Sequence, residues 1–301
     1  MTTETPDSLS PGTHTVTIGG IPQRYHVYGS GPVCLVHPGG PGFHWEYLRM
    51  PLVEQNMTTV YIEPIGTGAS GQLPSHPNGY TREQYAQAID GILDHLNVGR
   101  VHLLGHSHGA FVAQYYAASR GPRLAGVVLY ESAVAVGLDH YTEAAKNLDD
   151  FAGRHAGDPR LDDVMNAWQD IPSIKDNTAF TSVARRLFPA YLADYWAHET
   201  RYDPIRSAVS GSYISGLDDC LAPETIDDRT LLPSITVPTL VIVGREDFIC
   251  GPRWATEIHA LVPGSTLEVM EHSGHFAHFE EPEAFVEVVS SFVKGTTPDG
   301  A

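Results

Sequence analysis

The sequence predicts an α/β fold in which a mostly parallel, eight-stranded sheet carries helices on both faces. Two observations lead to this prediction. Short apolar runs rich in β-branched residues alternate with longer stretches of helical periodicity, and the alternation is interrupted only once along the chain. Strands and helices that alternate in this way form parallel sheets covered by helices. The 301 residues are 42% hydrophobic, which is enough for one large core.

The first half of the chain is expected to supply six of the eight strands. An opening strand pair is joined through Gly19-Gly20, and the six strands are expected at 13–18, 23–28, 32–36, 58–62, 101–104 and 124–130. A helix is expected near 45–55, and another follows the fifth strand as far as residue 119. A third helix spans 81–96, with Thr81 as its N-cap and Glu83 in its first turn.

The interruption divides the chain into three parts. Residues 136–233 are helical in pattern, polar, and rich in Asp, Arg and aromatic side chains, whereas apolar strands resume with 238–244 and 265–271. We therefore expect a core built from residues 1–135 and 235–301, with a helical cap over 136–234. A cap above the strand ends would shape a pocket and exclude water from it.

The most informative motif is a Gly-x-Ser-x-Gly segment centred on Ser107. It follows the apolar strand 101–104 and opens an amphipathic helix. In this context the motif is a nucleophile elbow, a tight turn that lifts the serine hydroxyl above the sheet. Glycines on both sides remove side chains that would clash across the turn, and the helix N-terminus points N–H groups at developing negative charge. Ser107 is therefore the candidate nucleophile.

Two further residues complete a candidate catalytic set. Asp247 lies in the loop after the strand 238–244, and His275 follows the strand 265–271. Because both loops and the elbow follow strand ends, the three side chains are expected at one edge of the sheet. In such a set the serine attacks, the histidine transfers the proton, and the aspartate orients and stabilises the imidazole.

A glycine-rich loop after the third strand adds a family resemblance. The loop reads His37-Pro38-Gly39-Gly40-Pro41-Gly42. Together with the elbow and the segment around His275, it resembles the α/β-hydrolase family over nearly the whole chain, and its proline iminopeptidase-like branch in particular. The resemblance implies the α/β-hydrolase fold with a cap, and an oxyanion hole formed by the N–H groups of Gly40 and His108. It also implies a Ser-His-acid site that needs no metal and no cofactor.

Glu131 is an alternative to Asp247 as the acid. It directly follows the strand 124–130. Some α/β-hydrolases, including lactonases that act on resorcylic macrolides, carry their acid at this point, and a carboxylate at either strand end can reach the same imidazole. Asp247 is preferred because the Gly-x-x-Asp arrangement after Gly244 is the commoner one, and Glu131 stays open as the alternative.

The residue after Asp247 bears on the substrate class. Iminopeptidases must hold a protonated N-terminus, and relatives of that type place a carboxylate directly after the catalytic aspartate. Here that position is Phe248. We therefore expect hydrolysis of a carboxylic ester or lactone through an acyl-enzyme. Two alternatives stay open, namely a proline iminopeptidase-like amide or peptide hydrolase, and a ligand-binding protein that keeps the triad but turns over slowly.

Aromatic side chains near these loops and in the cap are candidates for an apolar substrate pocket. Those expected to contact the substrate are Phe43 and Trp45 beside the glycine-rich loop, Trp196 in the cap, and Phe248.

Composition narrows the partners and the compartment. A formal charge of −18 disfavours nucleic acids and anionic membranes and leaves a small-molecule substrate. Three cysteines leave at least one unpaired, and residues 1–12 lack a signal-peptide pattern, so a reducing cytoplasm is expected. No apolar run reaches the ~20 residues of a membrane span. Monomer and homodimer both stay open.

Overall fold

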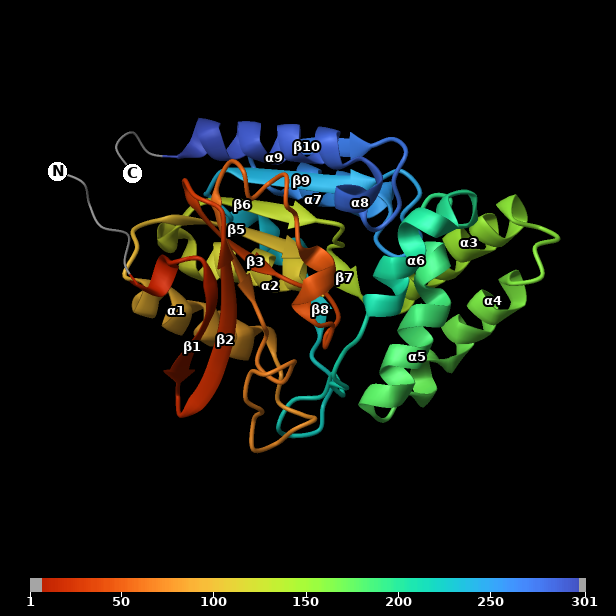
Figure 1. The fold of residues 1–301 in the computed structure, drawn as a ribbon, viewed down its shortest axis with the longest axis horizontal. Coiled ribbons are helices and arrows are strands. Elements are labelled where there is room, and N and C mark those ends of the chain that lie inside the picture. The colour runs from red at the N-terminus through yellow and green to blue at the C-terminus, as the bar shows by residue number, and fades with distance from the viewer. Residues whose placement is uncertain (1–6, 298–301) are drawn as a thin grey trace.

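The computed structural model describes residues 7–297, and a sheet of eight strands forms its centre (Figure 1). The strand order is β1-β2-β4-β3-β5-β6-β9-β10. β2 runs antiparallel to both neighbours, and the pairs from β4–β3 to β9–β10 are parallel. The strands are β1 (Gly12–Ile18), β2 (Ile21–Tyr28), β3 (Val33–His37), β4 (Thr58–Ile62), β5 (Val101–His106), β6 (Leu124–Tyr130), β9 (Thr239–Gly244) and β10 (Thr266–Met270). This confirms the predicted α/β class and the mostly parallel sheet.

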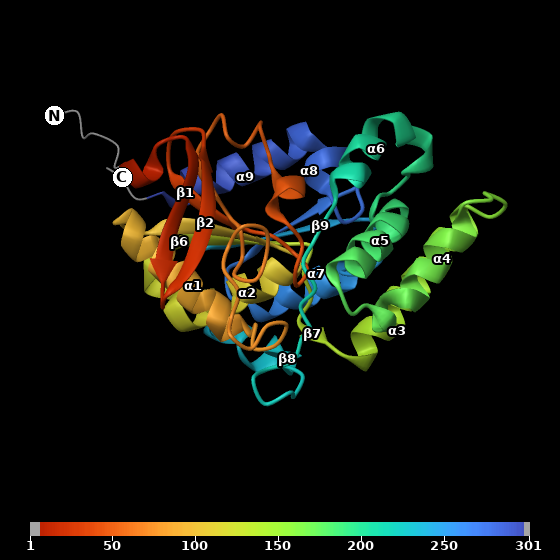
Figure 2. The ribbon, with the colours of Figure 1, turned by 60° about the horizontal axis from the view of Figure 1, so that its bottom comes forward.

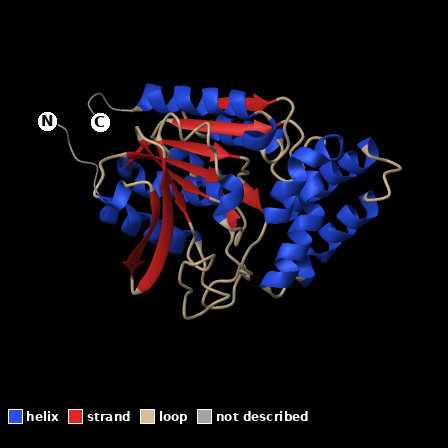
Figure 3. Cartoon of the chain, in the orientation of Figure 1, coloured by secondary structure: helices blue, strands red, loops and turns tan. Residues whose placement is uncertain are grey.

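Helices cover both faces of this sheet (Figure 3). The helices of the core are α1 (Arg82–Leu96), α2 (His108–Arg120), α7 (Pro252–Leu261), α8 (Ala277–Glu280) and α9 (Pro282–Thr296). Successive strand residues point to opposite faces. Leu103 accordingly packs in the cluster that contains α1, α2 and α7, while Leu104 packs in the cluster that contains α9. The sheet is therefore buried on both sides, which explains why its central strands are continuous apolar runs.

The strand order places a crevice at one edge of the sheet. From β3 the chain crosses to β4 on one side, and it later returns to β5 on the other side of β3. Such a switch point leaves a gap outside the carboxyl ends of the two strands, and ligands of open α/β sheets bind there. The loop after β3 carries Gly39 and Gly40, and the loop after β5 carries Ser107.

The segment between β6 and β9 forms a group of helices at that edge, and these helices are given the label cap. They are α3 (Leu138–Arg154), α4 (Leu161–Asp170), α5 (Asn177–Leu187) and α6 (Glu199–Ala208). They lie together beside the sheet in Figure 2. β7 (Ala135–Val136) pairs with β8 (Ile226–Asp227), so the segment leaves and re-enters the core at one place. Phe151 and Leu187 belong to a small core of its own, to which Phe248 contributes from the loop after β9.

The helix predicted near residues 45–55 is wrong in length. Only a 3₁₀ turn, η2 (Trp45–Leu48), forms. Arg49 is already extended, with φ −66° and ψ 127°. Pro51 follows Met50, and a proline disfavours the helical conformation of the residue before it. The N–H of Met50 instead donates to the hydroxyl of Tyr61 at 2.8 Å.

Residues 7–297 contain no candidate membrane span and no disulfide bond. None of the helices described there combines the length and the apolar character of a membrane span. The three cysteines, Cys34, Cys220 and Cys250, are free thiols.

Candidate active site

Ser107 lies on the turn between β5 and α2 in a strained backbone conformation. Its φ is 54° and its ψ is −120°, and a positive φ is uncommon for a residue with a side chain. A Cβ at Gly105 would collide with the backbone of Gly109, and a Cβ at Gly109 would collide with the carbonyl of His37. The N–H of Ser107 donates to the carbonyl of Tyr130 at 2.9 Å. The flanking glycines and the end of β6 therefore hold the serine on this turn.

Two backbone segments next to Ser107 can donate N–H groups to a substrate oxygen. Gly40 and His108 both line the cavity that contains Ser107. His108 is the first residue of α2, and the first N–H groups of a helix have no acceptor within it. The N–H of Gly39, by contrast, donates to the hydroxyl of Tyr47 at 2.7 Å. Gly40 is therefore the candidate donor of this loop.

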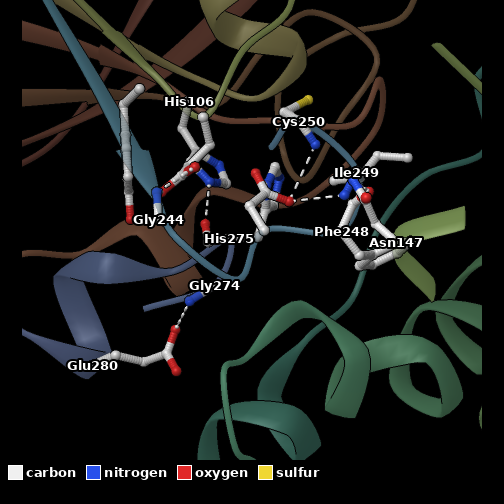
Figure 4. Close-up of polar contacts among 12 residues, drawn as sticks. His106, Asn147, Gly244, Phe248, Ile249, Cys250, Gly274, His275 and Glu280 are labelled. Carbon is white, nitrogen blue, oxygen red and sulfur yellow. Dashed lines mark hydrogen bonds and ion pairs between the residues drawn. The ribbon is translucent and has the colours of Figure 1, made fainter. Parts of the chain in front are cut away.

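His275 and Asp247 form a buried pair beside the serine. Nδ1 of His275 lies 2.7 Å from Oδ2 of Asp247. The other carboxylate oxygen accepts the N–H groups of Ile249 at 2.9 Å and Cys250 at 3.1 Å, which converge on it in Figure 4. Burial alone would raise the pKa of Asp247, but the charge of His275 and the hydrogen bonds outweigh it and hold the pKa below its ordinary value. An ionised Asp247 accepts a hydrogen bond from Nδ1 of His275, so the imidazole carries its proton on Nδ1. Nε2 of His275 is then the nitrogen that can accept a proton.

Glu131 lies behind Asp247 and is fully buried. Its carboxyl oxygens accept the N–H of Gly244 at 2.9 and 3.0 Å, and its carboxyl group hydrogen-bonds to Asp247. Burial, and then repulsion from Asp247, raise the pKa of Glu131 well above its ordinary value of 4.5. A neutral Glu131 can donate its proton to Asp247. The two carboxyl groups that the sequence offered as alternatives are therefore in contact with each other.

The backbone of the His275 loop is tied to the cap. The N–H of His275 donates to the carbonyl of Tyr191 at 2.6 Å. Glu280 accepts the N–H of Gly274 at 2.7 Å (Figure 4) and the N–H of Ala193 at 2.8 Å. Burial raises the pKa of Glu280 to about 8. The position of the imidazole therefore depends on the cap as well as on the sheet.

Ser107 and His275 open onto a cavity of about 690 Å³ between the sheet edge and the cap. Most of its wall is apolar or aromatic, with Phe111, Trp168 and Phe188 among the larger side chains. Glu224 is the one Asp, Glu, Lys or Arg among the described residues that line it. Burial lowers the pKa of three lining histidines, His106, His108 and His140, and that of His108 falls to about 3. Glu224 is itself paired with Arg82, whose Nε donates to it at 2.9 Å and whose backbone N–H donates to it at 3.1 Å, so a cation outside the lining offsets its charge.

Of the four aromatic residues expected to contact a substrate, one lines the cavity and three lie outside it. Phe43 lines the cavity and packs edge-on against Phe180 of α5. Trp45 lies outside it, with its ring stacked on His26 at 4.1 Å between centroids.

Trp196 and Phe248 also lie outside the cavity. Trp196 packs against Phe151 and His155 within the cap. Phe248 is buried against Trp168 and Tyr191, which do line the cavity. An aromatic residue in the right segment can face either way, and the spacing of these residues in the sequence does not fix the direction.

One group of possible metal ligands exists among the described residues, and it is the carboxyl–imidazole cluster itself. Ligand atoms of Glu131, Asp247 and His275 all lie within 4.8 Å of one another. However, the facing atoms of Asp247 and His275 are 2.7 Å apart, which is the separation of a charge-assisted hydrogen bond. A metal between them would have to displace that proton and separate the two groups.

Comparison with known proteins identifies the family. Residues 32–282 match the family model of the alpha/beta hydrolase fold. The chain belongs to the α/β-hydrolase family. The matched region includes the elbow, the loop of Asp247 and the loop of His275.

The relatives of this α/β-hydrolase include several hydrolases. It is 27% identical over 283 residues to 2-hydroxy-6-oxo-2,4-heptadienoate hydrolase of Pseudomonas putida, covering 92% of this chain and 95% of the relative. It is 24% identical over 289 residues to proline iminopeptidase of Lactobacillus crispatus, covering 87% and 89%. An esterase structure from Exiguobacterium antarcticum superimposes with a TM-score of 0.69 at 23% identity, covering 95% and 100%.

The raised pKa of Glu131 leads to a prediction about the stability of the fold. Above the ordinary pKa of 4.5 the carboxyl group of Glu131 loses its proton in the unfolded chain but keeps it in the folded protein. Folding then takes up a proton, so the free energy of unfolding falls as pH rises. Relative to Glu131→Gln, the wild-type free energy of unfolding should fall by up to about 1.4 kcal/mol per pH unit between about pH 5 and pH 7. Urea denaturation at several pH values measures this difference.

The exposed Glu287 of α9 supplies the control for this measurement. Glu287→Gln is measured at the same pH values and gives the effect of replacing a glutamate at an exposed position of the fold. A pH-independent difference between wild type and Glu131→Gln would mean that Glu131 is ionised in the folded protein.

Proposed function

We propose that this α/β-hydrolase cleaves a carboxylic ester or lactone through an acyl-enzyme on Ser107. One observation carries the proposal. A buried imidazole that is held by a carboxylate at 2.7 Å opens onto the same cavity as a serine on a strained turn at a helix N-terminus. This is the set of groups that nucleophilic acyl transfer needs.

The proposed reaction has two halves. In the first, the Ser107 hydroxyl oxygen bonds to the carbonyl carbon while Nε2 of His275 takes its proton. The carbonyl oxygen becomes an oxyanion that the N–H groups of Gly40 and His108 stabilise. The oxyanion then collapses, the bond to the alcohol oxygen breaks, and His275 returns the proton to that oxygen. In the second half, water takes the place of the serine hydroxyl, and the carboxylic acid leaves Ser107 with its hydroxyl restored.

Asp247, rather than Glu131, is the proposed acid of the triad. Asp247 bonds to His275 directly and is held in its ionised form, which stabilises the imidazolium that develops during the reaction. We propose a supporting role for the neutral Glu131, since its proton satisfies Asp247 without competing for the imidazole. The cap, residues 136–234, is proposed to close the cavity against water.

The cavity wall supports an uncharged, largely apolar substrate. Trp168, Phe180 and Phe188 offer surface to an acyl chain or ring, and Phe248, the residue after the proposed acid, is buried away from the substrate. Glu224 is the one lining carboxylate among the described residues, and its pairing with Arg82 disfavours it as the group that would hold an ammonium in the iminopeptidase alternative.

The nucleophile is tested by Ser107→Ala. Turnover of a p-nitrophenyl ester should fall by several orders of magnitude, leaving about 10³–10⁴-fold catalysis over water from the oxyanion hole and binding. Folding should be preserved because only a hydroxyl is lost. Ser119→Ala, in the same helix α2, is the matched control and should keep full activity. Retention of near-normal activity in Ser107→Ala would reject the acyl-enzyme.

The acid is tested by a matched pair of amides. Asp247→Asn should lower kcat by roughly 10⁴-fold, because the amide favours the wrong imidazole tautomer. Glu131→Gln should cost less than about tenfold, because the glutamine amide can still donate to Asp247 and accept from Gly244. The reverse ranking would assign the acid to Glu131.

The charge of the cavity is tested with two esters of equal length. A neutral p-nitrophenyl hexanoate should have a kcat/KM at least about tenfold above that of the adipate monoester, because the free carboxylate would lose its hydration against a largely apolar wall that has no Lys or Arg among its described residues. Glu224→Gln should reduce this ratio. A preference for the anionic ester would contradict the proposed substrate class. A preference for Pro-p-nitroanilide over both would favour the iminopeptidase alternative.

A further inference from the structure

His106, the residue before Ser107, is bonded at both ring nitrogens. Its Nδ1 lies 2.8 Å from the hydroxyl of Tyr47, and its Nε2 lies 2.9 Å from the carbonyl oxygen of His275 (Figure 4). The same hydroxyl of Tyr47 accepts the N–H of Gly39 at 2.7 Å. All three bonds are buried.

The two ends of this chain of hydrogen bonds fix the direction of every proton in it. The N–H of Gly39 can only donate, so the Tyr47 oxygen accepts there and turns its own proton toward His106. His106 then accepts at Nδ1 and carries its proton on Nε2. The carbonyl of His275 can only accept, which matches that proton. One tautomer of a neutral imidazole therefore satisfies every group.

A second imidazole holds Tyr47 in place from its other side. Nε2 of His278 lies 3.0 Å from the carbonyl oxygen of Tyr47, and Nδ1 lies 2.9 Å from the hydroxyl of Tyr130 at the end of β6. Burial lowers the pKa of both His106 and His278, and that of His278 falls to about 4. Both rings are therefore neutral and both serve as fixed connectors.

We propose that Tyr47 and His106 are positioning residues that hold the Gly39-Gly40 loop and the His275 loop in register with Ser107. The three loops come from the ends of β3, β5 and β10, and no covalent connection fixes their separation. The hydrogen-bond chain from Gly39 to His275 joins them across the elbow. This inference rests on the proposed acyl transfer, in which one loop supplies an oxyanion donor and the other supplies the base.

Tyr47 acts on the chemical step rather than on binding. The oxyanion and the imidazolium exist only along the reaction path, so a shift of the loops by a fraction of an ångström weakens the transition state more than the bound substrate. The ring of Tyr47 lines the cavity, but its hydroxyl is engaged by Gly39 and His106. Removing the hydroxyl alone therefore leaves the apolar wall intact.

Tyr47→Phe is the first test, with a p-nitrophenyl ester as substrate. It should lower kcat by about 10- to 100-fold, the loss expected from misplaced catalytic groups, and should change KM by less than about twofold. The rate of covalent labelling by a fluorophosphonate should fall in parallel, because labelling uses the same oxyanion donors and base.

Tyr61→Phe is the matched control. Tyr61 is also a buried tyrosine whose hydroxyl accepts a backbone N–H of the same segment, that of Met50 at 2.8 Å, and it donates to Glu54 rather than toward the active site. Loss of the Tyr61 hydroxyl should lower the thermal midpoint about as much as loss of the Tyr47 hydroxyl does, while kcat stays within about twofold of wild type. Equal losses of kcat in the two variants would overturn the proposal, since they would show a general effect of destabilising the segment.

Variants of His106 test the chain independently. Glutamine carries an acceptor and a donor side by side, as the Nε2–H tautomer does, so His106→Gln should retain more of kcat than His106→Leu. The double variant Tyr47→Phe/His106→Leu should lose little more than His106→Leu alone, because both residues act through one chain. Near-UV circular dichroism establishes that each variant is folded.

The outcomes separate this inference from the proposed function. Wild-type kcat in folded Tyr47→Phe, or additive losses in the double variant, would reject the positioning role while Ser107→Ala still abolished turnover. Full activity of Ser107→Ala would reject the proposed function itself.

Discussion

The conformation of one residue, Ser107, sets the arrangement of everything around it. A side chain at φ 54° is tolerated only where the surroundings fix it, and here two glycines allow the neighbouring backbone segments to close around the turn. The turn lies at the switch point of the sheet, so the loops after β3, β6, β9 and β10 all end near it. The glycine-rich loop, the two acids and the imidazole converge because strand order brings their loops to one place.

Most of the buried titratable groups around this turn are held in their neutral form. Of the two carboxyl groups behind His275, one is held ionised by hydrogen bonds and the other is held neutral by burial and by its neighbour. Two negative charges on neighbouring buried carboxyl groups would repel strongly, so a single proton between the two groups is expected. His106 and His278 are neutral because burial lowers the pKa of each ring. The cavity therefore meets the imidazole of His275, which is backed by one ionised carboxylate, Asp247, within a set of neutral groups.

The sequence predicted the elements of the sheet and the residues at its strand ends because those signals are local. An apolar run gives a strand, and Ser107, Asp247 and His275 each follow one, so their convergence follows from the topology. The direction of a side chain is not local, which is why Trp45 and Trp196 were expected in the cavity and lie outside it. Tyr47 had no signal at all: its partner His106 is 59 residues away, and only the folded chain brings them together. The relation of Glu131 to Asp247 likewise depends on a contact between two loops.

The most direct test of the account is to locate the acyl group during turnover. Wild-type enzyme mixed with excess p-nitrophenyl ester should release a burst of about one p-nitrophenol per site and then turn over repeatedly. Acid quenching followed by peptide mass spectrometry should find the acyl group on Ser107. A burst without further turnover would instead indicate a ligand-binding protein that keeps the triad. Steady hydrolysis with no acyl group on Ser107 would contradict the account, provided that the same quench is shown to preserve an acyl-enzyme when one is present.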